Sequence, residues 1–266
     1  MTTLALLGGG KMGEALLGGL IDAGRDPEDL AVAEVSVERR HALEARFPKV
    51  RVVPAPAWAV AEAEVVVVAV KPDDVAAALE AARPALAPTA LVVSIAAGVT
   101  IATIEALVPG HPVVRAMPNT PALVGLGAAA ISAGRHAGDE HLARAEAILS
   151  AVGTVARLPE SLLDAVTGLS GSGPAYVFLV AEALIEAGVH AGIPRPVSHS
   201  LVIQTLLGSA TLLAGGQGPE ALRAAVTSPG GTTAAGIAAL EARAVRAAFL
   251  EAVAAATARS RQLGQS

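Results

Sequence analysis

A glycine turn between an apolar run and an amphipathic stretch most constrains what this chain can fold into. The run is Leu4–Leu7, and the turn after it reads GGGKMG over residues 8–13. Glycines at its first, third and sixth positions match the fingerprint of a dinucleotide-binding loop. We expect Gly8 to form a tight turn, Gly10 to let the backbone approach a pyrophosphate, and Gly13 to pack a helix on the strand. Unpaired N–H groups at the start of that helix would face the phosphates.

The composition indicates a large aliphatic core and excludes several functions. The 266 residues are 53% hydrophobic but only 2% aromatic, so few side chains can stack on nucleic-acid bases. The formal net charge of -5 gives no field that would draw in DNA or an anionic membrane. Without cysteine, and with six scattered histidines, we expect no disulfide and no metal site.

The chain shows no targeting or membrane signal. Residues Met1-Thr2-Thr3 carry no basic region ahead of the first apolar run, which argues against a signal peptide. The longest purely apolar runs, such as Val65–Val70, are too short to span a bilayer. We therefore expect a cytoplasmic protein with no membrane partner.

The first 160 residues alternate short aliphatic runs with longer amphipathic stretches. Runs that do not alternate in polarity, such as Val65–Val68, predict strands buried on both faces of a parallel sheet. Strands alternating with helices predict a Rossmann-type, doubly wound α/β sheet, with all strand carboxyl ends at one edge, where ligands bind. The expected strands are Leu4–Leu7, Leu30–Val35, Val50–Val53, Val65–Val70, Leu91–Ile95, Pro112–Met117, Ala128–Ser132 and Thr154–Leu158, and the expected helices are Lys11–Ala23, Val37–Arg46, Asp74–Ala82, Thr100–Leu107 and Glu140–Ala151.

Beyond residue 160 strand patterns stop and Ala-rich helical periodicity begins. We therefore divide the chain into a dinucleotide-binding domain over residues 1–160 and an all-α domain over residues 161–266. The later helices carry apolar residues on more than one face, which predicts packing against a second copy in a homo-oligomer. The expected helices are Gly173–Ala191, Pro196–Ala214, Pro219–Val226, Thr232–Ala242 and Val245–Gln262.

The end of the second strand bears on the choice of dinucleotide. Glu34 lies about 20 residues after the glycine turn, where an acidic side chain binds the ribose hydroxyls of NAD. Ser36, Arg39 and Arg40 follow closely, however, and could hold the 2′-phosphate of NADP. Arg39 and Arg40 could equally form a solvated helix face. The sequence leaves these readings open.

Other segments at strand ends could also contact a ligand. Lys71, between a buried strand and Pro72, could meet a phosphate or a carboxylate, although lysine usually faces solvent. Small residues at Ala96–Gly98 would let a planar ring lie against the backbone. Asn119, between two prolines, could match a nicotinamide carboxamide or cap the next segment.

Two glycine-rich segments occur in the helical half. In residues 167–174 we expect a turn, with Ser172 or Gly173 capping a helix that has Pro174 in its first turn. In residues 227–233 the glycines free the backbone just before a helix, whose unpaired N–H groups would suit a carboxylate. An N-cap role for the threonines is the structural alternative there.

Seven motifs in this order resemble those of the pyrroline-5-carboxylate reductases. The motifs read GGGKMG, AVKP, SIAAGV, RAMPNTPA, TGLSGSGPAYVF, QTLLGSA and SPGGTT, and the likeness extends from Leu6 to about Val253. The resemblance implies a Rossmann domain, a helical dimerisation domain, and reduction of 1-pyrroline-5-carboxylate to L-proline in proline biosynthesis. It implies NADPH as hydride donor, with NADH as the alternative that Glu34 keeps open. It also implies a homodimer or a higher homo-oligomer.

The resemblance also implies roles for individual residues. Thr233 takes the position of a threonine that hydrogen-bonds the ring nitrogen of the substrate, which makes it the candidate catalytic residue. The substrate loop is Ser228, Gly230, Gly231, Thr232 and Thr233. The cofactor contacts are Leu7, Gly8, Gly9, Gly10, Lys11, Met12, Ser36, Arg39, Ala69, Val70, Lys71, Pro72, Ala96, Ala97, Gly98 and Asn119. The reaction requires the cofactor bound by one set of residues to meet the substrate bound by the other set.

Two other functions would share parts of this sequence pattern. A β-hydroxyacid dehydrogenase would share the plan of a Rossmann domain followed by helices, but that class resembles enzymes with a catalytic lysine in the helical domain, and no lysine follows Lys71. A dinucleotide sensor would bind NAD(P)H without turning anything over, and would have no need of the SPGGTT loop.

Overall fold

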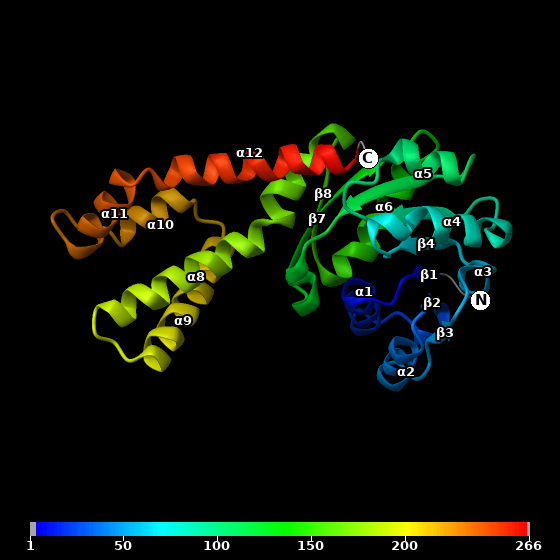
Figure 1. The fold of residues 1–266 in the computed structure, drawn as a ribbon, viewed down its shortest axis with the longest axis horizontal. Coiled ribbons are helices and arrows are strands. Elements are labelled where there is room, and N and C mark those ends of the chain that lie inside the picture. Colours follow the sequence, from blue (N-terminus) through cyan, green and yellow to red (C-terminus); the bar gives the residue numbers. More distant parts are fainter. Residues whose placement is uncertain (1–3, 265–266) are drawn as a thin grey trace. The chain divides into compact units, whose positions relative to one another are not determined.

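All eight predicted strands are present and pair in a single sheet (Figure 1). The computed structural model describes residues 4–264, so Met1–Thr3, on which the signal-peptide prediction rests, lie outside the described residues. The strand order is β3-β2-β1-β4-β5-β6-β7-β8. The strands are β1 (Leu4–Leu7), β2 (Leu30–Ala33), β3 (Arg51–Val53), β4 (Val65–Val68), β5 (Leu91–Ser94), β6 (Val113–Met117), β7 (Gly127–Ala133) and β8 (Gly153–Arg157).

The direction of the last two strands differs from the prediction. Strands β1 to β6 pair in parallel, but β7 runs antiparallel to β6, and β8 pairs in parallel with β7. The expectation that all carboxyl ends meet at one edge is therefore wrong for β7 and β8. Only a short 3₁₀ turn, Thr120–Val124, joins β6 to β7. A connection of this length permits antiparallel pairing, whereas parallel neighbours need a longer crossover.

Helices cover both faces of the sheet and enclose a separate core on each. Leu4 and Leu6 of β1 pack with helices α1, α2 and α6, whereas Ala5 and Leu7 pack with α3, α4 and α5. The alternation along one buried strand confirms the prediction of a sheet covered on both sides. The helices are α1 (Lys11–Asp22), α2 (Val37–Arg46), α3 (Pro56–Val60), α4 (Val75–Ala82), α5 (Ile101–Leu107) and α6 (Asp139–Leu149).

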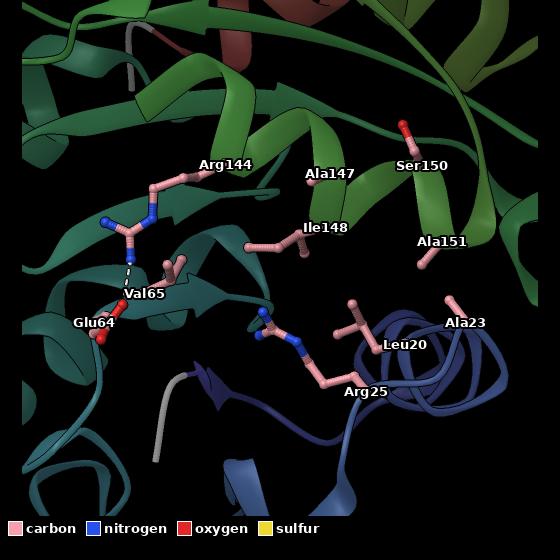
Figure 2. A pocket seen from close by; sticks show the side chains of 10 residues that line it. All are labelled: Leu20, Ala23, Arg25, Glu64, Val65, Arg144, Ala147, Ile148, Ser150 and Ala151. Carbon is pink, nitrogen blue, oxygen red and sulfur yellow. Dashed lines mark hydrogen bonds and ion pairs between the residues drawn. The ribbon is translucent and has the colours of Figure 1, made fainter. Parts of the chain in front are cut away.

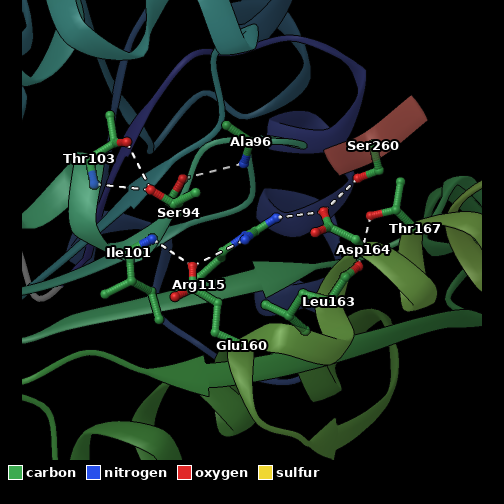
Figure 3. Close-up of polar contacts among 11 residues, drawn as sticks. Ser94, Ala96, Ile101, Thr103, Arg115, Glu160, Leu163, Asp164, Thr167 and Ser260 are labelled. Atoms are coloured by element: carbon green, nitrogen blue, oxygen red, sulfur yellow. Dashed lines mark hydrogen bonds and ion pairs between the residues drawn. The ribbon is translucent and has the colours of Figure 1, made fainter. Parts of the chain in front are cut away.

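The chain forms two compact units whose limits differ from a division at residue 160. One unit runs to Ser172 and takes in the segment from Ala254 onward, and the other is Gly173–Val253. An ionic cluster around the buried Arg115 joins residues beyond position 160 to the sheet (Figure 3). Arg115 of β6 contacts Glu160 at 3.1 Å and Asp164 at 3.7 Å, so Asp164, which lies beyond the predicted limit, belongs with the sheet as Glu160 does. The hydroxyl of Ser260 donates to Asp164 at 2.8 Å, which attaches the end of the last helix to the same unit.

The glycine-rich segment at residues 167–174 is helical rather than a turn. Helix α7 (Leu163–Val166) continues through a π-helical turn, Thr167–Gly171, toward α8 (Gly173–His190). Ser172 has helical dihedral angles, so the predicted cap there is wrong. Its N–H donates to the carbonyl of Thr167 at 2.8 Å, which is the five-residue pairing of a π-helix.

The second unit consists of helices that bury few of their own side chains. After α8 come α9 (Arg195–Ala214), α10 (Pro219–Ala225), α11 (Thr232–Ala242) and the first part of α12 (Val245–Leu263). Helices α8 and α9 cross closely, where Ser198 Oγ donates to the carbonyl of Ile185 at 2.8 Å. Large apolar side chains remain exposed on α8, α9, α11 and α12 and directly after α10, among them Val177, Phe178, Leu179, Leu201, Leu207, Leu212, Val226, Leu240 and Leu250.

Two stretches of helix are long and apolar enough to span a membrane, judged by length and composition alone. They are Glu160–His190 and Arg195–Ala214. Neither is a purely apolar run, because Glu160, Glu182 and Arg195 lie within them. Exposed apolar helices of this kind also fit burial against another protein copy.

Candidate functional site

The predicted glycine turn has the geometry of a strand-to-helix turn. Gly8 has a φ of 104°, a conformation that favours glycine, and a Cβ there would lie 2.7 Å from the carbonyl oxygen of Ala69. A Cβ on Gly13 would collide with the carbonyl oxygen of Gly8. The two glycines therefore let α1 begin directly above the end of β1, as the sequence predicts.

The start of α1 presents free backbone donors. Gly10 is the N-cap, and Glu14 is the first residue whose N–H bonds back to it, at 2.9 Å. Within the part of the chain that the structure describes, no acceptor is recorded for the N–H groups of Lys11, Met12 and Gly13. A Cβ on Gly10 would meet nothing within 4 Å. Open space beside three unpaired donors at a helix N-terminus fits a pyrophosphate.

A cavity of about 580 Å³ adjoins this turn, at the carboxyl ends of β1, β2 and β4. Its size lies within the range of small-molecule sites. It brings together predicted cofactor residues from two segments distant in sequence, namely Leu7, Gly8, Gly10, Ala69, Val70 and Lys71. The other described lining residues are Ala33, Glu34, Val35, Pro56, Asp74, Ala77, Ala78 and Ala81.

Glu34 is joined to the glycine turn by hydrogen bonds. One carboxylate oxygen accepts from the N–H of Gly9 at 2.9 Å, and the other accepts from the N–H of Ser36 at 2.9 Å. Ser36 caps α2 by accepting from the N–H of Arg39. Neither Ser36 nor Arg39 lines the cavity, although the sequence made both candidates for a 2′-phosphate.

The arginines near this strand end already have partners. Arg39 donates through Nε to the carbonyl of Gly9 at 2.6 Å and forms an ion pair with Glu14. Arg46 contacts the other oxygen of Glu14 at 2.6 Å. Burial raises the pKa of Glu14, but the hydrogen bonds and charges of the two arginines outweigh it, so that this pKa lies below its ordinary value. Arg40 donates to the carbonyls of Glu34 and Val35.

The remaining predicted cofactor segments lie outside this cavity. Pro72 opens a short 3₁₀ turn after Lys71 and does not line the cavity. Ala96 and Gly98 follow β5 and are buried. A Cβ on Gly98 would lie 3.5 Å from Cβ of Leu263, so the end of α12 packs over this segment.

Asn119 makes two structural hydrogen bonds. Its Nδ2 donates to the carbonyl of Ser170 at 3.1 Å, and its Oδ1 accepts from the N–H of Ala128 at 2.8 Å. It stands at the N-cap of the Thr120–Val124 turn but makes no side-chain capping bond. The capping alternative is therefore wrong, and a contact with nicotinamide stays a prediction.

The predicted substrate loop ends in a helix start without a side-chain cap. The N-cap of α11 is Gly231, so Thr232 and Thr233 occupy the first two helical positions, and the capping alternative is wrong. Gly230 has a φ of 68°, and a Cβ on Gly231 would collide with Oγ of Ser228. Among residues 4–264, no acceptor is recorded for the N–H groups of Thr232 and Thr233, and no partner for their hydroxyls.

A second cavity of about 500 Å³ lies at the opposite edge of the sheet, where β4 begins with Val65 (Figure 2). Arg25 and Arg144 border it, and Arg144 is paired with Glu64 at 2.9 Å. None of the predicted site residues lines this cavity.

Family models match both halves of the chain. Residues 160–263 match the model for pyrroline-5-carboxylate reductase dimerisation, and residues 3–98 match the model for NADP oxidoreductase, coenzyme F420-dependent. A pyrroline-5-carboxylate reductase from Synechocystis is 47% identical, and the match covers 98% of each chain. The chain belongs to the pyrroline-5-carboxylate reductase family. The Mycobacterium tuberculosis pyrroline-5-carboxylate reductase is 46% identical, covering 99% of this chain and 97% of the relative.

Solved pyrroline-5-carboxylate reductases share the whole fold. The Coxiella burnetii enzyme superposes with a TM-score of 0.94 at 36% identity, covering 100% of this chain and 99% of the other. The Plasmodium falciparum enzyme, solved with NADP bound, has a TM-score of 0.86 at 31% identity, covering 99% of this chain and 98% of the other. These matches confirm the predicted family, the Rossmann-type sheet followed by a helical dimerisation domain, and an NAD(P)H-dependent oxidoreductase.

Part of the cavity wall in this member of the pyrroline-5-carboxylate reductase family could not be predicted from its sequence. Ala77, Ala78 and Ala81 of α4 line the cavity opposite the strand ends. They share one helix face at spacings of three and four residues, but in a chain so rich in alanine this pattern is too common to single out. The hydrogen bond from Gly9 to Glu34 was also missed, because the sequence gives no register between the turn and β2.

Proposed function

We propose that this chain reduces 1-pyrroline-5-carboxylate to L-proline with hydride from NAD(P)H, as the last step of proline biosynthesis. The observation that carries the proposal is the start of α11. It places N–H groups beside the hydroxyl of Thr233, none of which has a recorded partner among residues 4–264, within a segment that matches the reductase dimerisation model. A carboxylate and an adjacent ring nitrogen are the two groups that such a start would bind.

The chain's own groups would do little covalent chemistry. Bound NAD(P)H supplies the hydride, which adds to the imine carbon while the ring nitrogen gains a proton. The N–H groups of Thr232, Thr233 and Ala234 hold the substrate carboxylate at the positive end of α11. The hydroxyl of Thr233 orients the ring nitrogen. Positioning supplies most of the acceleration, and the proton on the nitrogen comes from water.

The exposed helices of Gly173–Val253 support a homo-oligomer. Phe178, Leu179 and Leu250 each expose more than 60% of their surface, at 63%, 65% and 74% respectively. We expect a second copy to cover these side chains, in a homodimer or a higher assembly built from dimers. The same burial would account for the apolar lengths of α8 and α9 in a cytoplasmic protein.

The experiment is a direct assay. Purified protein is mixed with 1-pyrroline-5-carboxylate and either NADH or NADPH, and the absorbance of the reduced nicotinamide is followed. We expect it to decay with at least one cofactor and proline to accumulate in equal amount. Decay with neither cofactor, in protein shown to be folded by circular dichroism, would overturn the proposed activity.

A further inference from the structure

The structure points to Glu34 as the residue that sets cofactor choice, and we propose that it makes the chain select NADH over NADPH. The inference rests on the proposed function, which requires only that one of the two bind. NADH and NADPH differ in a single group, the phosphate on the 2′ oxygen of the adenosine ribose. The question is therefore what the protein places beside that oxygen.

The protein places the carboxylate of Glu34 beside that oxygen. In a Rossmann-type sheet the adenosine ribose lies at the carboxyl end of β2, beside the glycine turn. Glu34 directly follows β2 and lines the cavity there. The N–H of Gly9 and the N–H of Ser36 hold one carboxylate oxygen each. Each oxygen keeps a lone pair with which it can accept a hydrogen bond from a ribose hydroxyl.

A 2′-phosphate would meet the same carboxylate as a like charge. The carboxylate cannot swing away without losing its bonds to Gly9 and Ser36. Among the described residues that line the cavity, the charged side chains are Glu34, Asp74 and Lys71, two acidic and one basic. Lys71 follows β4, which is separated from β2 by β1 in the strand order. The cavity wall beside β2 would therefore repel the 2′-phosphate, which is a dianion.

Arg39, the natural candidate for a phosphate contact, is held elsewhere. It spans the carbonyl of Gly9 and the carboxylate of Glu14, and it does not line the cavity. Turning it toward a 2′-phosphate would leave Glu14 with Arg46 alone. Arg40 is occupied by two backbone carbonyls and is likewise absent from the cavity wall. Arg39 therefore acts as a positioning residue for the glycine turn.

The test is calorimetric titration of the intact protein with NADH and with NADPH, which needs no turnover. We expect the wild type to bind NADH about tenfold more tightly or better, since one unpaired like-charge contact costs at least that much near a protein surface. Glu34→Gln keeps an acceptor for the N–H of Gly9 but removes the charge, so NADPH should gain affinity and the ratio should fall toward one. Glu44→Gln, the matched control, removes an exposed charge from α2 outside the cavity and should leave the ratio unchanged.

Arg39→Gln distinguishes two roles for Arg39, which could position the glycine turn or hold the 2′-phosphate. If Arg39 positions the glycine turn, both dinucleotides should lose affinity by the same factor. A loss confined to NADPH would show that Arg39 holds the 2′-phosphate and would overturn the inference. Equal affinities of the wild type for NADPH and NADH would also overturn the inference. If neither dinucleotide bound folded protein, the proposed function itself would fail.

Discussion

Asn119 donates a hydrogen bond to the carbonyl of Ser170 at 3.1 Å, across 51 positions of sequence. Four residues after Ser170 stands Pro174, which has no N–H to offer that carbonyl. The side chain of Asn119 supplies the donor from the loop after β6. Its Oδ1 also fixes the N–H of Ala128 at the start of β7. One amide therefore connects the sheet to the π-helical turn that leads into α8.

Replacing Asn119 should weaken the fold measurably. Asn119→Ala removes both bonds and leaves two backbone groups unpaired at a site that is 9% exposed, which should cost about 2–4 kcal/mol of unfolding free energy. The neighbouring exposed residue provides a control, because Thr120→Ala should cost about 0.5 kcal/mol or less. Urea titration followed by circular dichroism gives both values. Equal effects of the two substitutions would show that the amide contributes nothing.

In the ionic cluster around Arg115, removing the arginine and removing the two acidic groups should lower the free energy of unfolding by different amounts. The Arg115 side chain is 4% exposed, whereas those of Glu160 and Asp164 are 34% and 21% exposed. Water can reach the acids after Arg115→Met, but it cannot reach the guanidinium after Glu160→Gln and Asp164→Asn together. We therefore expect the double variant to lose more stability than Arg115→Met, about 3–5 kcal/mol. Denaturant titration measures the order, and the reverse order would contradict it.

The strands and long helices could be predicted because short aliphatic runs and helical periodicity carry local information. All eight strands were predicted, and Val37–Arg46 and Thr232–Ala242 have the predicted bounds. The antiparallel direction of β7 could not be predicted, since alternation along a strand is the same in both directions. The π-helical turn was missed for a related reason: three glycines and a proline within 168–174 read locally as a turn.

For the site, the sequence predicts which residues take part but not the groups with which they form hydrogen bonds. Gly8, Gly13 and the loop before α11 could be predicted, because positive φ and close approach leave glycine as the signature. The sequence left a 2′-phosphate contact and a solvated helix face as equal alternatives for Arg39. Its bonds to Gly9 and Glu14 join segments 25 or more residues apart, and no local pattern encodes such pairings.

Three glycine substitutions should separate folding from cofactor binding. A Cβ at Gly13 would collide with the turn, so Gly13→Ala should lose both stability and NAD(P)H affinity. A Cβ at Gly10 meets only open space, so Gly10→Ala should fold normally yet bind the dinucleotide at least about tenfold more weakly, because the methyl group takes the pyrophosphate position.

Gly18→Ala is the control for these glycine variants. Its nearest neighbour would be Phe47 at 3.8 Å, and the change should stabilise α1 by about 0.5–1 kcal/mol without altering binding. Thermal melts and titration with NADH test all three variants. Normal binding by Gly10→Ala would place the pyrophosphate elsewhere.

Lowering the pH should remove the contribution of Glu14 to the stability of the fold. Arg39 and Arg46 lower its pKa from the ordinary 4.5 despite the opposing effect of burial. A folded-state pKa below the unfolded one gives stability that is present above the unfolded value and is lost as the pH falls through the folded value. Glu14→Gln should therefore lower the melting temperature at pH 7 by a few degrees, and the gap to wild type should close as the pH falls below the ordinary pKa of 4.5. A gap that persists at the lowest pH would mean that packing, not charge, is what the substitution removes.

The hydroxyl of Thr233 should matter for turnover and not for dinucleotide binding. It lies at the second position of α11, has no recorded partner among residues 4–264, and belongs to the loop assigned to the substrate. Thr233→Val keeps the shape of the side chain but removes the hydroxyl, so kcat should fall about a hundredfold while the Kd for NADH stays within a factor of about two. Thr233→Ser should restore most of the rate, because it returns the hydroxyl. Thr232→Val changes the exposed neighbour in the same way and should leave kcat within about threefold of wild type. Initial rates at saturating cofactor, with calorimetric titration of NADH, give both quantities. If Thr233→Val lowered cofactor affinity and turnover together, or if Thr233→Ser failed to recover activity, the threonine would be supporting the helix start instead of orienting the imine nitrogen.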